Sequence, residues 1–150
     1  MKQQISWTAV ALALFVAFPS SSPAQKISPD EQRIVTYIDA HKSDAEALLE
    51  KSVNVESATE NLVGVREAGM VFGGELLALG FKTEWIEMPT EMRRAGHLFA
   101  EKKGTKGKRI LLLGHLDTVL SGEKFRRERD KAYGTGTSDM KGGDVIIIEA

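Results

Sequence analysis

The chain has 150 residues, of which 42% are hydrophobic and 27% are charged, and its formal net charge is −1 at pH 7. This length and balance suit one modest folded domain and argue against wholesale disorder. The near-neutral charge offers no basic surface, so we expect no nucleic-acid partner. Because the chain has no cysteine, disulfides and thiolate sites are excluded, and any metal must be held by His, Asp, Glu or water.

The first 24 residues have the pattern of a secretory signal peptide. Lys2 precedes an apolar run over residues 7–18, interrupted only by Thr8, and small residues then lead to Ala24. A membrane anchor is the alternative, but a helical run of this length spans only ~18 Å of a ~30 Å hydrocarbon core. We therefore expect cleavage after Ala24, a mature chain that does not associate with membranes, and a periplasmic or secreted location.

Two amphipathic helices are predicted next. Residues 28–31 (SPDE) combine an N-cap serine, a proline at the first helical position and a glutamate at the third, and an apolar stripe follows as far as Leu49. Residues 43–46 (SDAE) repeat the capping pattern, so this helix is expected to break near His41. Residues 62–79 predict a second helix that ends at Gly80.

Three glycines lie in the middle of the second predicted helix. They lie at positions 69, 73 and 74, and each costs up to ~1 kcal/mol relative to alanine. Close packing against a neighbouring element would explain them.

The hydrophobic period changes after Gly80 and predicts strands. Residues 81–88 (FKTEWIEM) alternate, and residues 96–104 (GHLFAEKKG) predict another short strand. Residues 109–117 (RILLLGHLD) are continuously apolar, as in a strand buried on both faces beneath helices. Residues 144–150 (DVIIIEA) favour a third helix. This order predicts an α/β domain with layered helix–sheet–helix packing.

The apolar run ends in His115 and Asp117. Residues i and i+2 of a strand point to the same side, and ligand sites of open α/β sheets lie at the C-terminal edge. A metal-bound histidine commonly donates its second ring N–H to a carboxylate, and Asp117 is placed to accept it. The alternative is a plain strand end in which His115 bonds to its own loop, and an isolated His-x-Asp favours that alternative.

A glycine-rich segment, residues 133–143 (YGTGTSDMKGG), places Asp139 just before the third helix. Gly134-x-Gly136 lacks the third glycine of the dinucleotide-binding fingerprint. No Gly-Lys-Ser/Thr follows, so the segment is not a nucleotide-binding P-loop either. A carboxylate on such a loop, near a His-Asp pair, suits a hard or borderline cation. Taken alone, Asp139 could equally belong to an ordinary turn.

Together, LLLGHLDTV at 111–119 and AYGTGTSDMKGG at 132–143 resemble the glutamate carboxypeptidase family of dinuclear zinc exopeptidases, which also holds aminoacylases, dipeptidases and desuccinylases. The resemblance implies that His115 ligates one Zn²⁺, that Asp117 orients this histidine in the catalytic apparatus, and that Asp139 bridges two Zn²⁺ ions. It implies hydrolysis of peptide or N-acyl amino acid amide bonds by a metal-activated water. A homodimer of the full-length protein is compatible with it.

In this family the general-base glutamate, the remaining metal ligands and a smaller second domain come later in the chain. The resemblance therefore implies that residues 25–150 are the N-terminal portion of a catalytic domain, truncated and inactive by itself. Glu149 lies too close to Asp139 to match the family's general base. The alternative class is a non-catalytic exported α/β fragment or binding module. A biosynthetic desuccinylase is disfavoured, because that chemistry belongs in the cytoplasm.

Other polar residues are given no part in the site. His97 lies in a predicted strand, which favours a structural role over a ligand role. Residues 123–131 (EKFRRERDK) form a charge run that predicts an exposed loop or hairpin near the mouth of the site. Lys141 is interpreted as no more than a loop cap.

Overall fold

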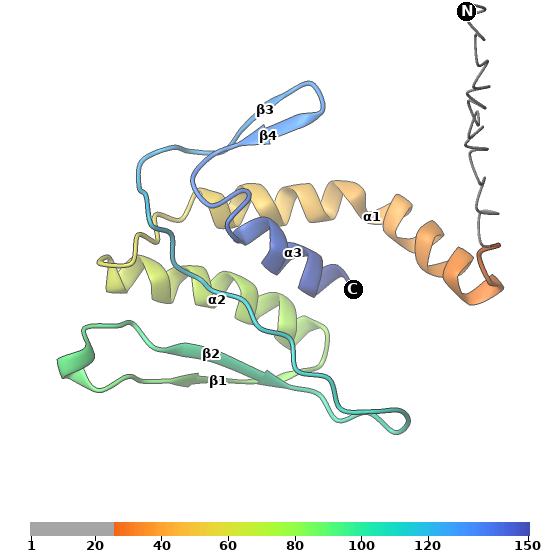
Figure 1. The fold of residues 1–150 in the computed structure, drawn as a ribbon, viewed down its shortest axis with the longest axis horizontal. Helices are drawn as coiled ribbons and strands as arrows, with labels where there is room; N and C mark the ends of the chain where they lie inside the picture. The colour runs from red at the N-terminus through yellow and green to blue at the C-terminus, as the bar shows by residue number, and fades with distance from the viewer. Residues whose placement is uncertain (1–25) are drawn as a thin grey trace, which may run out of the picture.

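The computed structural model describes residues 26–150, and the predicted signal peptide at 1–24 lies outside them (Figure 1). Within residues 26–150 no helix is both long and apolar enough to cross a membrane. The elements in chain order are α1 Pro29–Val53, α2 Leu62–Ala78, β1 Lys82–Ile86, the short 3-10 helix η1 Thr90–Met92, β2 His97–Glu101, β3 Arg126–Glu128, β4 Lys131–Tyr133 and α3 Lys141–Glu149.

Helix α1 begins as the sequence predicts. The Ser28 side chain accepts a hydrogen bond from the Glu31 backbone at 3.2 Å, and the Glu31 carboxylate accepts one from the Ser28 backbone at 2.6 Å. The predicted break near His41 is wrong, because α1 continues unbroken for 25 residues. The His41 ring stacks on Tyr37 one turn earlier and its Nδ1 lies 2.8 Å from the Tyr37 carbonyl, contacts that support the helix across the expected break.

Helix α2 occupies the predicted position and packs in the middle of the molecule, between α1 and the β1–β2 pair (Figure 1). Its Phe72 joins Leu48 of α1 and Val145 of α3 in the buried core. Two of its glycines lie against neighbouring side chains, Gly69 against Trp85 and Leu116, and Gly73 against Leu98. Gly74, by contrast, has nothing within 4 Å of the position of an added Cβ, so packing does not explain it.

The strands form two separate antiparallel pairs. Strands β1 and β2 pair from Lys82↔Glu101 to Ile86↔His97, and the partly buried side chains of β1 alternate as predicted. Strands β3 and β4 form a hairpin within the charge run at 123–131, which agrees with the expected loop or hairpin. Helices and small sheets therefore make up a mixed fold consistent with an α/β domain.

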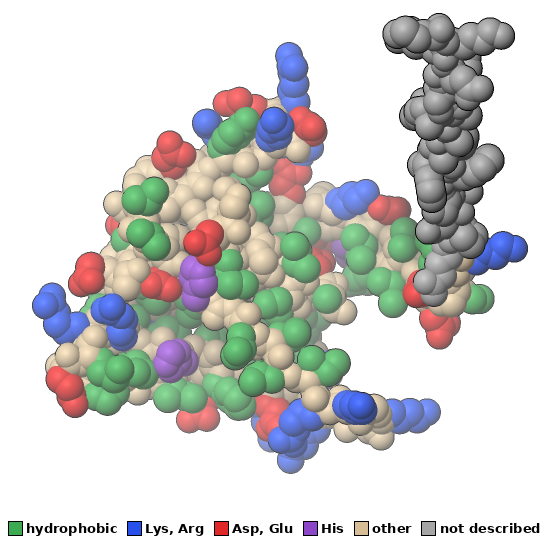
Figure 2. All heavy atoms as spheres, viewed as in Figure 1, with side chains coloured by type: hydrophobic (Ala, Val, Ile, Leu, Met, Phe, Trp, Pro, Cys, Tyr) green, Lys and Arg blue, Asp and Glu red, His purple; other side chains and the backbone are tan. Residues whose placement is uncertain are grey.

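The apolar run at 109–117 corrects the sequence prediction. It is extended but is not a strand, and its aliphatic side chains are exposed rather than buried: Ile110 78%, Leu111 75%, Leu112 59% and Leu113 78%. A strand buried on both faces needs paired neighbours, and within residues 26–150 the β1–β2 pair does not bond to this segment. A parallel bridge between Ala58 and Thr118 holds the residue that follows its end. Figure 2 shows hydrophobic side chains spread over the face that the segment crosses in Figure 1.

Candidate metal centre

His115 lies between two carboxylates that come from different parts of the chain. Its Nε2 is 2.9 Å from Asp139 Oδ1, and its Nδ1 is 2.9 Å from the Asp117 carbonyl oxygen and 3.4 Å from Asp117 Oδ1. The structure thus brings together the three residues singled out in the sequence. Although 109–117 is not a paired strand, its extended backbone still places His115 and Asp117 side by side.

The carboxylates favour a positively charged His115 ring. Partial burial lowers the pKa of His115, but the hydrogen bond to Asp139, the bond to the Asp117 carbonyl and the two negative charges outweigh that effect. The pKa of His115 is therefore raised above its ordinary value. Because both ring nitrogens face acceptors, protonation of both satisfies both contacts.

Asp139 reaches His115 because of the glycine-rich loop. Gly136 has a φ of +87°, a backbone conformation that favours glycine. An added Cβ there would also lie 2.8 Å from Thr118 and 3.1 Å from Lys141. The Gly136 carbonyl accepts a hydrogen bond from the Lys141 backbone at 2.9 Å, which joins the loop to the start of α3. The Asp139 side chain is left 78% exposed, open to water and to a ligand.

Thr59 is a contributor that the sequence interpretation missed. Its hydroxyl donates to Asp117 Oδ2 at 2.7 Å, on the carboxylate that faces His115. The two residues are 58 positions apart in the chain, so no local spacing links them. In the sequence, Thr59 is distinguished merely as a hydroxyl residue in the polar stretch between the two helices, which does not indicate a contact with Asp117.

Lys141, interpreted as a loop cap, is in fact buried and ties α3 to the end of α1. It is 1% exposed, and its ammonium donates to the Ser52 and Val55 carbonyls at 2.9 and 2.7 Å. Burial and the charge of Lys124 lower the pKa of Lys141 to about 8, and the negative charges of Asp144 and Glu56 oppose that shift. Lys141 therefore braces the loop that carries Asp139.

Asp144 is a second missed residue. It is 8% exposed, and its Oδ1 occupies the space that a Cβ on Gly114 would need, directly before His115 in the chain. Its Oδ2 has no hydrogen-bond partner among the described residues. Burial raises the pKa of Asp144 to about 6, against the opposing charges of His115 and Lys141.

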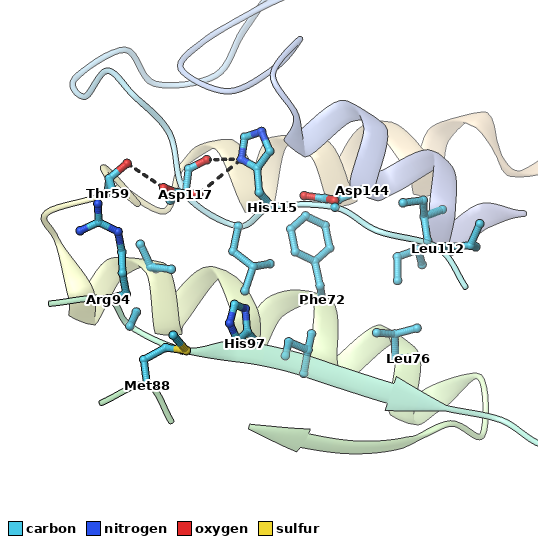
Figure 3. A pocket seen from close by; sticks show the side chains of 18 residues that line it. Thr59, Phe72, Leu76, Met88, Arg94, His97, Leu112, His115, Asp117 and Asp144 are labelled. Atoms are coloured by element: carbon cyan, nitrogen blue, oxygen red, sulfur yellow. Dashed lines mark hydrogen bonds and ion pairs between the residues drawn. The ribbon is translucent and has the colours of Figure 1, made fainter. Parts of the chain in front are cut away.

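A cavity of about 500 Å³ opens beside the His115 side chain. Figure 3 shows His115, Asp117 and Thr59 along one rim, Asp144 entering from α3, and Met88 and His97 on the opposite wall; Arg94 also lines the cavity. Phe72 and Leu76 of α2 and Leu112 add apolar surface. His97 lies on β2 as expected, and it faces His115 across the cavity rather than joining its carboxylates (Figure 3).

The donor set of His115 and Asp139 fits a zinc ion. Zinc accepts imidazole nitrogen and carboxylate oxygen, and Nε2 and Oδ1 already lie close together. Nδ1 faces Asp117, which is the usual arrangement of the ring nitrogen that does not bind the metal. Among residues 26–150, however, no group of three or more His, Cys, Asp or Glu side chains could hold a metal. The described residues thus bring together two donors of the types that zinc binds, fewer than the usual number of protein ligands.

Comparison with known proteins points to metallohydrolases. The chain is 35% identical to carboxypeptidase G2 of Pseudomonas sp. (strain RS-16) over 166 aligned positions, which cover 99% of the chain and 36% of that protein. It is 36% identical to acetylornithine deacetylase of Pasteurella multocida (strain Pm70) over 83 positions, covering 50% of the chain and 21% of that protein. An uncharacterized metallohydrolase of Methanocaldococcus jannaschii is 30% identical over 96 positions, covering 64% and 25%.

These relatives share hydrolase names, and the chain spans about a third or less of the length of each of the three. No family model matches the chain. The similarity to carboxypeptidase G2 nevertheless extends over 99% of the present chain and includes both segments of the His115 site. The homologues of this chain are therefore members of the glutamate carboxypeptidase and aminoacylase family of zinc metallohydrolases.

Proposed function

We propose that the protein is a zinc-dependent amidohydrolase of the glutamate carboxypeptidase type, which cleaves amide bonds of peptides or N-acyl amino acids. The observation that carries the proposal is the placement of His115, with Nε2 at 2.9 Å from Asp139 and Nδ1 against Asp117. His115 and Asp139 would hold zinc, with Asp139 shared between two ions. When bound, zinc lowers the pKa of a coordinated water and polarises the carbonyl of the scissile amide.

The chain's own residues prepare this site. Asp117 holds the Nδ1 side of the His115 ring, so that Nε2 faces Asp139. The largely exposed Asp139 presents its carboxylate where water and substrate have access. The apolar walls of the adjoining cavity leave room for the part of the substrate next to the amide.

The activity test is release of the C-terminal amino acid from an N-acyl glutamate by the full-length protein, as distinct from residues 1–150 alone, with added zinc. We expect turnover that is abolished by a chelator and by Asp139→Ala, because that change removes a shared ligand. The matched control is Asp130→Ala, which changes an exposed acid in the β3–β4 turn and is expected to leave turnover unchanged. Equal activity of Asp139→Ala and the unaltered protein would contradict the proposal.

A second candidate is a non-catalytic α/β binding module, favoured by the incomplete ligand set among residues 26–150. We further propose that residues 1–150 alone do not turn over substrate, because the resemblance places the general base and the remaining metal ligands later in the chain. Zinc content distinguishes the two candidates: a working enzyme holds two ions, and a binding module holds one weakly or none. Turnover by residues 1–150 well above a metal-free control would place the base within them.

Export to the periplasm or the medium is also proposed, from the pattern of residues 1–24. N-terminal sequencing of the exported protein should begin at Gln25 or within a few residues of it. An intact Met1 on cytoplasmic protein would contradict export.

A further inference from the structure

We propose that Thr59 is a positioning residue of the metal centre, whose hydroxyl fixes the carboxylate of Asp117 and through it the ring of His115. The proposal rests on the function above, because it takes His115 as a metal ligand. It adds a residue from the segment between α1 and α2, far in sequence from both motifs.

The contacts form a continuous chain from Thr59 to Asp139. The Thr59 hydroxyl donates to Asp117 Oδ2 at 2.7 Å, Asp117 Oδ1 lies 3.4 Å from His115 Nδ1, and His115 Nε2 lies 2.9 Å from Asp139. Figure 3 shows Thr59 and His115 on opposite sides of the Asp117 carboxylate. One carboxylate oxygen is thus held by Thr59 while the other faces the ring.

The backbone places the hydroxyl opposite Asp117. Thr59 N donates to the Thr118 carbonyl at 3.0 Å, and Thr118 N donates to the Ser57 carbonyl at 2.9 Å. These bonds form the bridge that holds the end of the extended run at 109–117. The side chain of Thr59 is therefore set by main-chain pairing, and its hydroxyl meets Asp117 at little entropic cost.

The hydroxyl has a choice of acceptor, and the distances favour the carboxylate. The Thr118 carbonyl is the alternative at 3.3 Å, but it already accepts from Thr59 N. A hydrogen bond to an ionised acceptor is shorter and stronger than one to a neutral carbonyl. The 2.7 Å bond to Asp117 is consequently the dominant one.

The size of the expected effect follows from what remains when the hydroxyl is removed. The Asp117 carbonyl would still contact His115 Nδ1 at 2.9 Å, but the carboxylate could turn away from the ring. Loss of a group that directly supports a metal ligand costs ~10–100-fold in metal affinity, and Thr59 acts one contact further out, so we expect a loss of ~3–10-fold.

The test compares Thr59→Val with Thr59→Ser in the intact protein. Valine keeps the branched shape and the backbone bonds but removes the hydroxyl, whereas serine keeps the hydroxyl. Zinc affinity is measured by competition with a chromophoric chelator, and the absorption spectrum of the cobalt-substituted protein reports ligand geometry. We expect Thr59→Val to bind zinc ~3–10-fold more weakly with an altered cobalt spectrum, and Thr59→Ser to restore both.

A double-mutant comparison separates positioning from general stability. In an Asp117→Ala background, Thr59→Val should cause no further loss of zinc affinity, because the hydroxyl has lost its acceptor. Equal zinc affinity and equal cobalt spectra of Thr59→Val and the unaltered protein would overturn the proposal. If the unaltered protein itself bound no zinc, the proposed function would fail instead.

A measurement on the unaltered protein keeps the test decisive if Thr59→Val does not fold. In a high-resolution crystal structure of the zinc-loaded protein, the Thr59 hydroxyl should lie within hydrogen-bonding distance of the Asp117 carboxylate. A separation beyond that distance would overturn the proposal.

Discussion

At His115 the proposed zinc ion would compete with a proton for the same ring nitrogen, Nε2. The His115 ring directs Nε2 to Asp139 and Nδ1 to Asp117, and these contacts raise the pKa of His115. Metal binding at Nε2 requires the neutral ring, so a proton must leave first. The carboxylates beside His115 therefore make a proton compete with zinc for Nε2 more strongly than it would at a histidine with an ordinary pKa.

This competition predicts that zinc affinity falls in acid by about tenfold per pH unit below the pKa of His115. Zinc titrations of the intact protein between pH 5 and pH 8 would measure the fall. His97→Gln serves as the control and should leave the pH profile unchanged, since His97 lies on the opposite wall of the cavity. A zinc affinity independent of pH over this range would remove His115 from the ligand set.

Asp144 predicts a second pH dependence, in the stability of the metal-free protein. Burial raises its pKa to about 6 in the folded state, so the folded protein binds this proton more tightly than the unfolded chain does. The stabilisation by the neutral carboxyl is complete in acid, below the unfolded pKa of ~4, and is lost as pH rises through about 6.

Asp144→Asn removes this ionisation and keeps the side-chain shape. The unfolding free energy of the variant minus that of the unaltered protein should be ~1–3 kcal/mol larger at pH 7.5 than at pH 4. Denaturant unfolding with a chelator present, at both pH values, measures the difference. The same stability difference at the two pH values would show that Asp144 does not titrate in this range.

At the scale of the helix, Gly69 and Gly74 of α2 make a matched pair for a test of packing. A Cβ at Gly69 would lie 2.5 Å from the Trp85 ring and 3.1 Å from Leu116, whereas a Cβ at Gly74 would meet nothing within 4 Å. Gly69→Ala should destabilise the protein by ~1–3 kcal/mol through overpacking, and Gly74→Ala should stabilise it by ~0.5–1 kcal/mol. Thermal unfolding measures both, and shifts of equal sign would contradict the packing of α2 on β1.

Local rules predicted the helices well, because capping and hydrophobic spacing act within a few residues. The SPDE capping box and α2 were predicted correctly, and the break near His41 failed because a second capping pattern does not interrupt a helix that neighbouring turns continue. The strand at 109–117 failed because strand pairing needs partners from elsewhere in the chain. Thr59 and Asp144 were missed for the same reason, since each reaches the site through contacts far apart in sequence.

At the scale of the whole molecule, the site depends on three segments that meet at one place. The bridge at Ala58 and Thr118 holds the end of the extended run, and Lys141 ties the Asp139 loop and α3 to the end of α1. The aliphatic side chains before His115 remain exposed among residues 26–150. The three-segment assembly therefore depends on a few long-range contacts near His115 rather than on a sheet.

The central claim is that zinc binds between His115 and Asp139. The most direct test is a crystal structure of the zinc-soaked intact protein, with anomalous data collected on both sides of the zinc absorption edge. We expect an anomalous peak in contact with His115 Nε2 and an Asp139 carboxylate oxygen, while His115 Nδ1 still faces Asp117. Zinc bound elsewhere, with His115 Nε2 still bonded directly to Asp139, would contradict the assignment of this centre.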